Sequence, residues 1–205
     1  TTTINEGQTL AATSSAAGKI YLVPNNTAPV LTALQDSVFA GKGKVIDVTA
    51  NVAGSIATTG LKPGYYLAYA YDPTAGAISA KVGVQINDIT PPVISPFTSG
   101  NVSATGTISA SVNEDAMLYL IPASVTNYAI ANIINEAVYQ LAVAKDIAAS
   151  ILLSDVNPAL AVGTSYKFIA TDYALTPNIS APTTPNITIV DAPLTMTVDP
   201  TGTVE

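Results

Sequence analysis

The sequence contains no cysteine, no histidine, no tryptophan and no arginine. Without cysteine there is no disulfide framework and no thiol chemistry. Without histidine there are no Ser-His or Cys-His nucleophile pairs and no histidine-ligated metals. No phosphate-binding glycine loop occurs, and the only adjacent carboxylates, Glu114 and Asp115, fall in a predicted turn. We therefore expect no enzymatic activity.

Charge is also scarce. Only 10% of the residues are charged, against about 25% in an average globular domain. All cationic residues are lysines and the formal net charge is −7, so the basic patch that nucleic acid requires is missing and we expect no nucleic-acid partner. A hydrophobic content of 48% does not fit disorder. The surface should carry small, neutral, polar side chains, which favours packing against copies of the same chain.

Long hydrophobic runs are absent too. No stretch of about 18 apolar residues occurs, so we expect no membrane insertion. No signal peptide is present, and a chain that opens on Thr1 is typical of a processed or trimmed N-terminus. With the lack of cysteine, these features suit a secreted prokaryotic protein at the cell surface, and we expect an extracellular location.

The chain does contain one six-residue segment that occurs twice, and we call this segment the repeated phrase. Residues 19–24 read Lys-Ile-Tyr-Leu-Val-Pro and residues 117–122 read Met-Leu-Tyr-Leu-Ile-Pro, which places Tyr21 and Tyr119 98 positions apart. The match continues towards the N-terminus without a gap. A period of about 100 residues is one sandwich-sized domain. We therefore predict two related domains, residues 1–90 and 91–191, followed by an extended tail, residues 192–205.

Alternation of apolar and polar residues predicts the strands. They are residues 9–13, 19–23, 44–49, 65–71 and 82–86 in the first copy, and 143–147, 166–171 and 187–190 in the second. The aromatic strand of each copy follows a glycine turn and ends in aspartate, at Asp72 or Asp172. We expect Tyr66 and Tyr166 to be buried beside these turns as a tyrosine corner is, with Tyr65 as the alternative in the first copy.

Each copy should also contain one short helix. In the first, Thr27 is the expected cap and Pro29 an opening position; the apolar stripe consists of Val30, Leu31, Leu34 and Val38. In the second, the helical spacing includes Ile130, Ile133, Ile134, Ala137, Val138 and Leu141. The polar face of the second helix carries no Lys or Arg, which favours packing on the sandwich over binding a membrane surface.

Together these features resemble the bacterial immunoglobulin-like or fibronectin-type-III-like repeats of S-layer proteins and large surface adhesins. The resemblance lies in the Leu-x-Pro-Gly-x-Tyr turn from Leu61 to Tyr66, in the Ile-Ser-Ala stretch after each aromatic strand, and in the joint Asp88-Ile-Thr-Pro-Pro-Val-Ile94. It implies a mostly β fold of two tandem immunoglobulin-like β-sandwich domains, each with one short inserted helix. It implies a structural or adhesive role, because such modules serve both.

Calcium is the one candidate ligand. Oxygen donors in predicted loops are Asn113, Glu114, Asp115, Asp172 and Asp191, and Ca²⁺ takes roughly six to eight oxygens. The first copy has Ser15-Ala16-Ala17 where the second has Asn-Glu-Asp, so the competing interpretation is that these are solvated turn residues.

Cell-surface glycans are a candidate partner. Four tyrosines of one predicted strand, Tyr65, Tyr66, Tyr69 and Tyr71, offer rings on which sugars could stack. Alternation directs them to two faces of a sheet, so packing in the core is the competing interpretation.

The termini are candidate contacts between subunits. Leu194, Met196 and Val198 alternate with threonines, which predicts a strand with one apolar face. The N-terminal stretch, with Thr1, Thr3 and Ile4, is extended in character and short of a partner. Either strand could be added to a sheet of a neighbouring copy. The tail could instead pair within its own domain, fray, or be the stump of a longer repeat array.

The predicted function is a non-enzymatic structural subunit of an extracellular prokaryotic surface assembly, a filament or an S-layer, built from copies of the chain and linked by strand exchange. The alternative is an adhesin, or a carbohydrate-binding or spacer module of a larger secreted protein.

Overall fold

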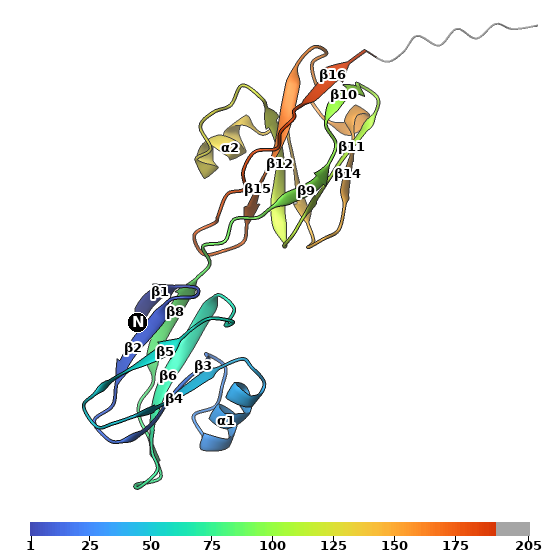
Figure 1. Cartoon of the computed structure of the whole chain (residues 1–205). Helices are drawn as coiled ribbons and strands as arrows, with labels where there is room; N and C mark the ends of the chain where they lie inside the picture. Colours follow the sequence, from blue (N-terminus) through green and yellow to red (C-terminus); the bar gives the residue numbers. More distant parts are fainter. Residues whose placement is uncertain (192–205) are drawn as a thin grey trace, which may run out of the picture. The chain divides into compact units, whose positions relative to one another are not determined.

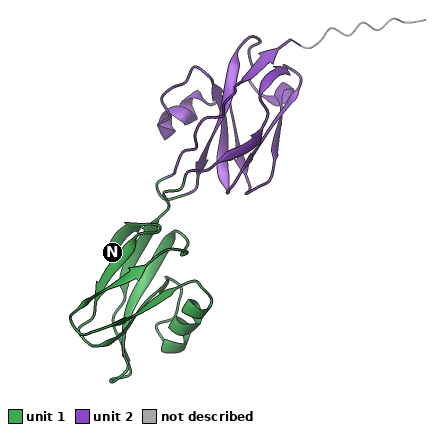
Figure 2. Ribbon diagram, viewed as in Figure 1, with its two compact units in different colours: residues 1–90, 174–176 green, residues 91–173, 177–205 purple. Residues whose placement is uncertain are grey.

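The computed structural model describes residues 1–191, which form two compact units (Figures 1 and 2). Unit 1 comprises Thr1–Thr90 with Ala174–Thr176, and unit 2 comprises Pro91–Tyr173 with the described residues from Pro177 onwards. Each unit is a sandwich of two β-sheets that carries one α-helix.

In unit 1 the larger sheet has the order β1-β8-β6-β3-β4, with β7 beside β6. These strands are β1 (Thr2–Asn5), β3 (Gly18–Pro24), β4 (Lys44–Val48), β6 (Gly64–Asp72), β7 (Ala77–Ile78) and β8 (Val82–Asn87). The smaller sheet contains β2 (Thr9–Thr13) and β5 (Ala53–Ala57). Strand β1 runs parallel to β8, and the remaining pairs are antiparallel.

In unit 2 the larger sheet has the order β10-β16-β15-β12-β13 and the smaller one the order β14-β11-β9. The strands are β9 (Ile94–Phe97), β10 (Gly100–Ser103), β11 (Thr107–Val112), β12 (Ala116–Pro122), β13 (Tyr139–Val143), β14 (Ala149–Leu152), β15 (Ser165–Asp172) and β16 (Ile187–Val190), and a 3₁₀ turn spans Leu153–Asp155. This order is that of an immunoglobulin-like sandwich. The predicted fold class is confirmed: mostly β, two such sandwiches, each with a short helix.

The repeated phrase forms a central strand of the larger sheet in each unit. In β3 of unit 1, Ile20 and Leu22 point into the sandwich core, while Tyr21 and Val23 pack on the other side of the sheet. There they meet Leu34 of helix α1 (Leu31–Phe39). The strand is apolar on both faces because a sheet covers one face and a helix covers the other.

Unit 2 repeats this arrangement in β12. Leu118 and Leu120 lie in the sandwich core. Tyr119 and Ile121 pack with Ile133 of helix α2 (Ile130–Glu136), beside the opposite face of the sheet (Figure 1). Burying each such large side chain contributes about 1.5–3 kcal/mol, so the phrase is a main source of stability in both units.

Helix α1 is confirmed, but its predicted start is wrong. The residue before the helix is Val30, with extended φ −126° and ψ 143° and no capping side chain. Thr27 lies in the preceding turn, where its N–H bonds the carbonyl of Pro24 at 3.0 Å. The turn chemistry of Pro24 to Thr27 competes successfully with helical capping.

Helix α2 is shorter than predicted. The helix ends at Glu136, and Leu141 lies in β13, opposite Leu118 of β12. The strand predicted at residues 143–147 is therefore displaced to Tyr139–Val143. The apolar spacing here fits a helix and an alternating strand equally well, and pairing with β12 decides between them.

The other predicted strands are confirmed to within about two residues at each end. Strands β5, β7, β9, β10 and β14 are short, at two to five residues, and were not predicted. The expectation that Thr1 to Asn5 lacks a partner is wrong. Strand β1 pairs with β8 of its own unit, with Thr3 opposite Gln85 and Ile4 opposite Ile86. Ile4 is half-buried against the core of unit 1.

Both tyrosine corners are present. Tyr66 is 6% exposed, and its hydroxyl donates to the carbonyl of Lys62 at 2.8 Å. Tyr166 is 5% exposed, and its hydroxyl accepts the N–H of Ala161 at 3.3 Å. Both pair with the proline that ends the repeated phrase. Tyr65 is 41% exposed and is not the substitute.

Replacing Tyr66 by Ala should lower the free energy of unfolding of unit 1 by about 3–5 kcal/mol, the range for deleting a buried aromatic ring. The matched control is Tyr65→Ala on the neighbouring, partly exposed ring, which should cost less than about 1 kcal/mol. Denaturant unfolding measures both. Equal losses in the two variants would contradict the assignment of the corner to Tyr66.

The same residue should make unit 1 sensitive to alkaline pH. Burial raises the pKa of the Tyr66 hydroxyl above its ordinary value of 10.0, and the hydrogen bond to Lys62 offsets part of this. The folded state therefore holds the proton more tightly than the unfolded state. The stability that the protonated Tyr66 hydroxyl contributes is complete below about pH 10 and is lost as pH rises through the raised pKa. Unfolding followed from pH 8 to 11 should show this loss, and Tyr66→Phe should reduce it.

Candidate functional site

The structure separates the five calcium candidates. The Oδ1 atom of Asn113 accepts the N–H of Val93 at 2.7 Å, and Oδ1 of Asp115 accepts the N–H of Lys145 at 2.8 Å. Asp191 is exposed directly after β16. The side chains of Asn113 and Asp115 therefore hold loops in place through backbone N–H groups.

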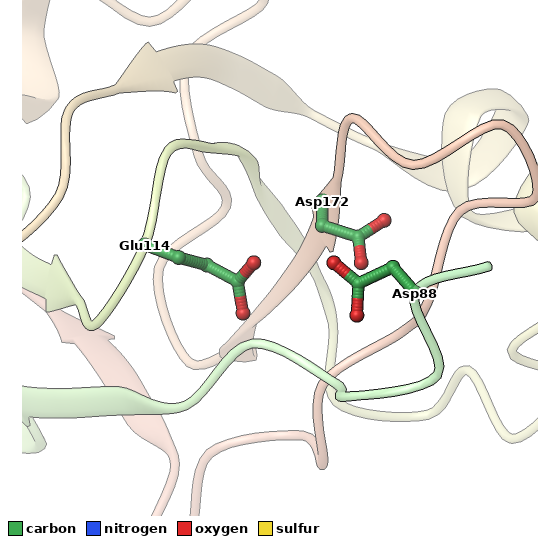
Figure 3. A group of neighbouring side chains, drawn as sticks. All are labelled: Asp88, Glu114 and Asp172. Carbon is green, nitrogen blue, oxygen red and sulfur yellow. The ribbon is translucent and has the colours of Figure 1, made fainter. Parts of the chain in front are cut away.

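Two of the candidates do approach each other within unit 2. Carboxylate oxygens of Glu114 and Asp172 lie within 4.8 Å (Figure 3). Asp172 is 4% exposed, and its two oxygens accept the backbone N–H of Asn178 at 2.8 Å and the side-chain amide of Asn178 at 2.7 Å. Asp88, also drawn in Figure 3, belongs to unit 1. Two carboxylates offer fewer oxygens than the roughly six to eight that calcium takes, and calcium binding stays a prediction.

The repeat explains why an aspartate ends both aromatic strands. In unit 1, Oδ1 of Asp72 accepts the N–H groups of Thr74 and Ala75 at 2.8 and 3.2 Å. Aspartate stabilises a turn in this way by bonding backbone two or three residues on. Asp172 does the same for a longer loop through Asn178. The shared role of Asp72 and Asp172 is therefore to hold the loop after the strand.

Replacing Asp172 by Asn should lower the free energy of unfolding of unit 2 by about 1.5–3 kcal/mol, the range for a hydrogen bond to a charged group. Because the loss comes from the loop, it should be the same in calcium and in a chelator. Asp191→Asn, on an exposed carboxylate, is the control and should cost less than about 0.5 kcal/mol. A loss that appears only in calcium would contradict the loop role and indicate a bound ion.

Sequence reasoning missed one buried cation. Lys167 of β15 is 6% exposed, and its ammonium donates to the carbonyls of Ala123 and Val125 at 3.0 and 2.7 Å and to the hydroxyl of Tyr128 at 2.9 Å. These three bonds use its three protons. All three partners lie between β12 and α2, so Lys167 holds this loop. A single lysine inside an apolar strand was the available signal.

The four tyrosines proposed to stack sugars do not share one exposed surface. Tyr66 and Tyr69 are 6% and 4% exposed, and Tyr71 is half-buried. Only Tyr65 of the four is well exposed. The buried pair, Tyr66 and Tyr69, packs in the cores of unit 1. Glycan binding stays a prediction, but these four tyrosines do not form a surface for it.

A sheet edge distinguishes the two units. In unit 2, β9 pairs with β11 on the side away from β14, with Ile94 opposite Val112 and Phe97 opposite Ala110. Residues 9–13 and 107–111 align in the repeat, so β2 of unit 1 corresponds to β11. Within residues 1–191, β2 pairs with β5 alone. Among these residues no strand lies beside the edge of β2 that corresponds to the β9 edge, and at the repeat offset of 98 the counterpart of β9 falls before Thr1.

A groove of about 210 Å³ lies beside this edge. It is lined by residues of β1, β2, β3, β6 and β8, among them Leu10, Ala12, Ile20, Ala68, Val82 and Val84, and no lining residue is charged. In unit 2, side chains of β9 occupy this position in the sandwich: Ile94 is 8% exposed and Phe97 packs against the core. The groove therefore corresponds in position to β9 of unit 2.

The exposure of matching side chains differs between the two units in the same way. Ala12 of β2 is half-buried, whereas Ala110, its counterpart in β11, is 1% exposed. Val82, on the opposite wall, is 55% exposed. Of the predicted subunit contacts, Thr1 is exposed and Thr3 and Ile4 belong to β1. Leu194, Met196 and Val198 lie outside the described residues.

Comparison with known proteins identifies no family: no family model and no curated protein matches the chain. Among solved structures, it is similar to a biofilm-associated protein BSP domain at 14% identity and TM-score 0.31, with 93% of this chain and 29% of that chain covered. It is similar to the CD2-binding domain of CD58 at 11% identity and TM-score 0.38, with 94% of this chain and 98% of that chain covered. It is also similar to a bacterial ice-binding adhesin of 1.5 MDa at 15% identity and TM-score 0.29, with 93% of this chain and 62% of that chain covered.

The chain thus spans 29% of the first of these structures and 62% of the third. TM-scores this low support no conclusion about function, and the immunoglobulin-like assignment rests on the strand order of the two units. Among the residues that the structure describes, no helix has the length and apolar character needed to cross a membrane.

Proposed function

We propose that the protein is a non-enzymatic structural subunit of an extracellular prokaryotic surface assembly, a filament or an S-layer, in which copies of the chain bind one another. The observation that carries this proposal is the scarcity of charge: only 10% of the residues are charged, and the groove beside β2 in unit 1 is lined by uncharged residues. Another copy of the chain can cover such a surface without burying charges.

An unpaired strand edge presents backbone N–H and C=O groups that can pair with another strand. Proteins that remain monomeric protect such edges with lysine, proline, bulges or a covering segment. Strand β2 reads Thr-Leu-Ala-Ala-Thr and contains neither lysine nor proline. Its sequence therefore leaves the edge able to pair.

The composition supports the same proposal. With 10% charged residues and a neutral groove, contacts between copies remove few charges from water, and burying unpaired charges would be costly. Copies that meet through two different surfaces, one donating and one accepting, form open chains if the rotation between them does not close a ring. A filament is the simplest product of this geometry.

Purified protein should assemble into ordered filaments or sheets as its concentration rises, because contacts between copies remove few charges from water. Negative-stain electron microscopy shows the assembly, and sedimentation gives its concentration dependence. A protein that stays monomeric at every concentration and binds cell-surface glycans on an array would contradict the proposal. That result would establish the alternative, an adhesin or a carbohydrate-binding module.

A further inference from the structure

We propose that a polar pocket of unit 2, between the loop of residues 123–129 and helix α2, binds one ring of a neutral sugar. The pocket has a volume of about 290 Å³ and is lined by Ser124, Val125, Thr126, Asn127, Asn132 and Glu136. All of these residues belong to unit 2. The inference goes beyond assembly between copies, because it assigns a ligand to the surface of a single chain.

The internal repeat shows that the loop beside this pocket is built differently in unit 2. Tyr66 and Tyr166 pair with the prolines that end the two repeated phrases, so the residues that follow them, Leu67 and Lys167, hold equivalent positions. Leu67 packs in the apolar core under helix α1. Lys167 instead bonds the loop between β12 and α2. That loop spans residues 123–129, one residue more than residues 25–30 of unit 1.

The lysine has a cost that the fold does not require. Burying an ammonium group costs free energy, and unit 1 forms the same sandwich with leucine at this position. What the lysine adds is a fixed loop, through three hydrogen bonds and the ring of Tyr128, whose centroid lies 5.0 Å from the ammonium nitrogen. A wall held in one conformation lowers the cost of ordering a binding site. We therefore interpret Lys167 as a positioning residue for the pocket.

The lining offers a mixture of hydrogen-bond donors and acceptors. The hydroxyls of Ser124 and Thr126 can do both. Oδ1 of Asn127 accepts a backbone N–H at 3.0 Å, which leaves its NH₂ group to donate to a ligand. The amide nitrogen of Asn132 donates to the carbonyl of Asn127 at 2.8 Å, which leaves its Oδ1 to accept. The carboxylate of Glu136 adds a strong acceptor.

This mixture favours a sugar over an ion. The lining holds one carboxylate and no cation, so an anion would meet only negative charge. A calcium ion takes roughly six to eight oxygens, and the carbonyls of Ala123 and Val125 already accept protons from Lys167. Each hydroxyl of a neutral sugar both donates and accepts, as the lining does. The volume lies at the lower end of the range of about 300–1,000 Å³ for ligand pockets, which fits a single ring.

Nuclear magnetic resonance of the full chain, labelled with ¹⁵N, tests the site. The probes are the methyl glycosides of glucose, galactose, mannose and N-acetylglucosamine. We expect at least one of them to shift the backbone amide signals of residues 124–127, 132 and 136 in a saturable way. The affinity should be millimolar, because the ligand is small and no aromatic ring lines the pocket. Shifts with none of the probes, or shifts confined to other residues, would overturn the inference.

Glu136→Gln tests the lining without altering its shape. The variant should weaken binding at least about tenfold, because a hydrogen bond to a charged group is replaced by a neutral one. The matched control is Asp155→Asn, which removes an equal charge from an exposed side chain of unit 2 outside the pocket and should leave the affinity unchanged. Equal affinity of Glu136→Gln and the natural chain would overturn the site. So would saturable shifts of the same amides by calcium chloride but by no sugar.

Lys167→Leu introduces the residue that unit 1 has and tests the positioning role. We expect the variant to keep the amide spectrum of the two sheets of unit 2 while the signals of residues 123–129 change and sugar binding is lost. A folded variant that binds sugar as the natural chain does would overturn this role. The proposed function is tested separately, by sedimentation without sugar. A natural chain that assembles but shows no sugar-induced shifts preserves the function and overturns only this site.

Discussion

Burial of both faces of one strand is the constraint on which each unit depends. The strand that carries the repeated phrase contributes alternate residues to two cores, one between the sheets and one under the helix. Because neither face can meet water, the smaller sheet and the helix must both be in place for the strand to be stable. This explains why each copy carries a helix after the phrase.

The two units satisfy this constraint to different degrees. In unit 2, a third strand completes the smaller sheet, and Ile94 closes the core. Within residues 1–191, the corresponding side of unit 1 is a groove beside β2, and the repeat counterpart of β9 falls before Thr1.

The polar residues that first suggested chemistry serve the loops. Asn113, Asp115 and Asp172 accept backbone N–H groups, and Lys167 donates to backbone carbonyls. Loops that leave a sandwich carry unpaired backbone groups, and buried ones must be bonded. In a chain with so few charges, the calcium candidates were conspicuous in the sequence, whereas Lys167 was missed although it has the same structural role.

The sequence by itself determined the repeat, the central strands, the tyrosine corners at Tyr66 and Tyr166, and the existence of two helices. These features depend on local alternation and turn chemistry, which a short window of residues contains. Only the tertiary structure decided that Leu141 belongs to a strand, that β1 pairs with β8, and that β2 pairs with β5 alone within residues 1–191. Strand pairing joins residues far apart in the chain, so an edge is open or closed according to partners that no local pattern reveals.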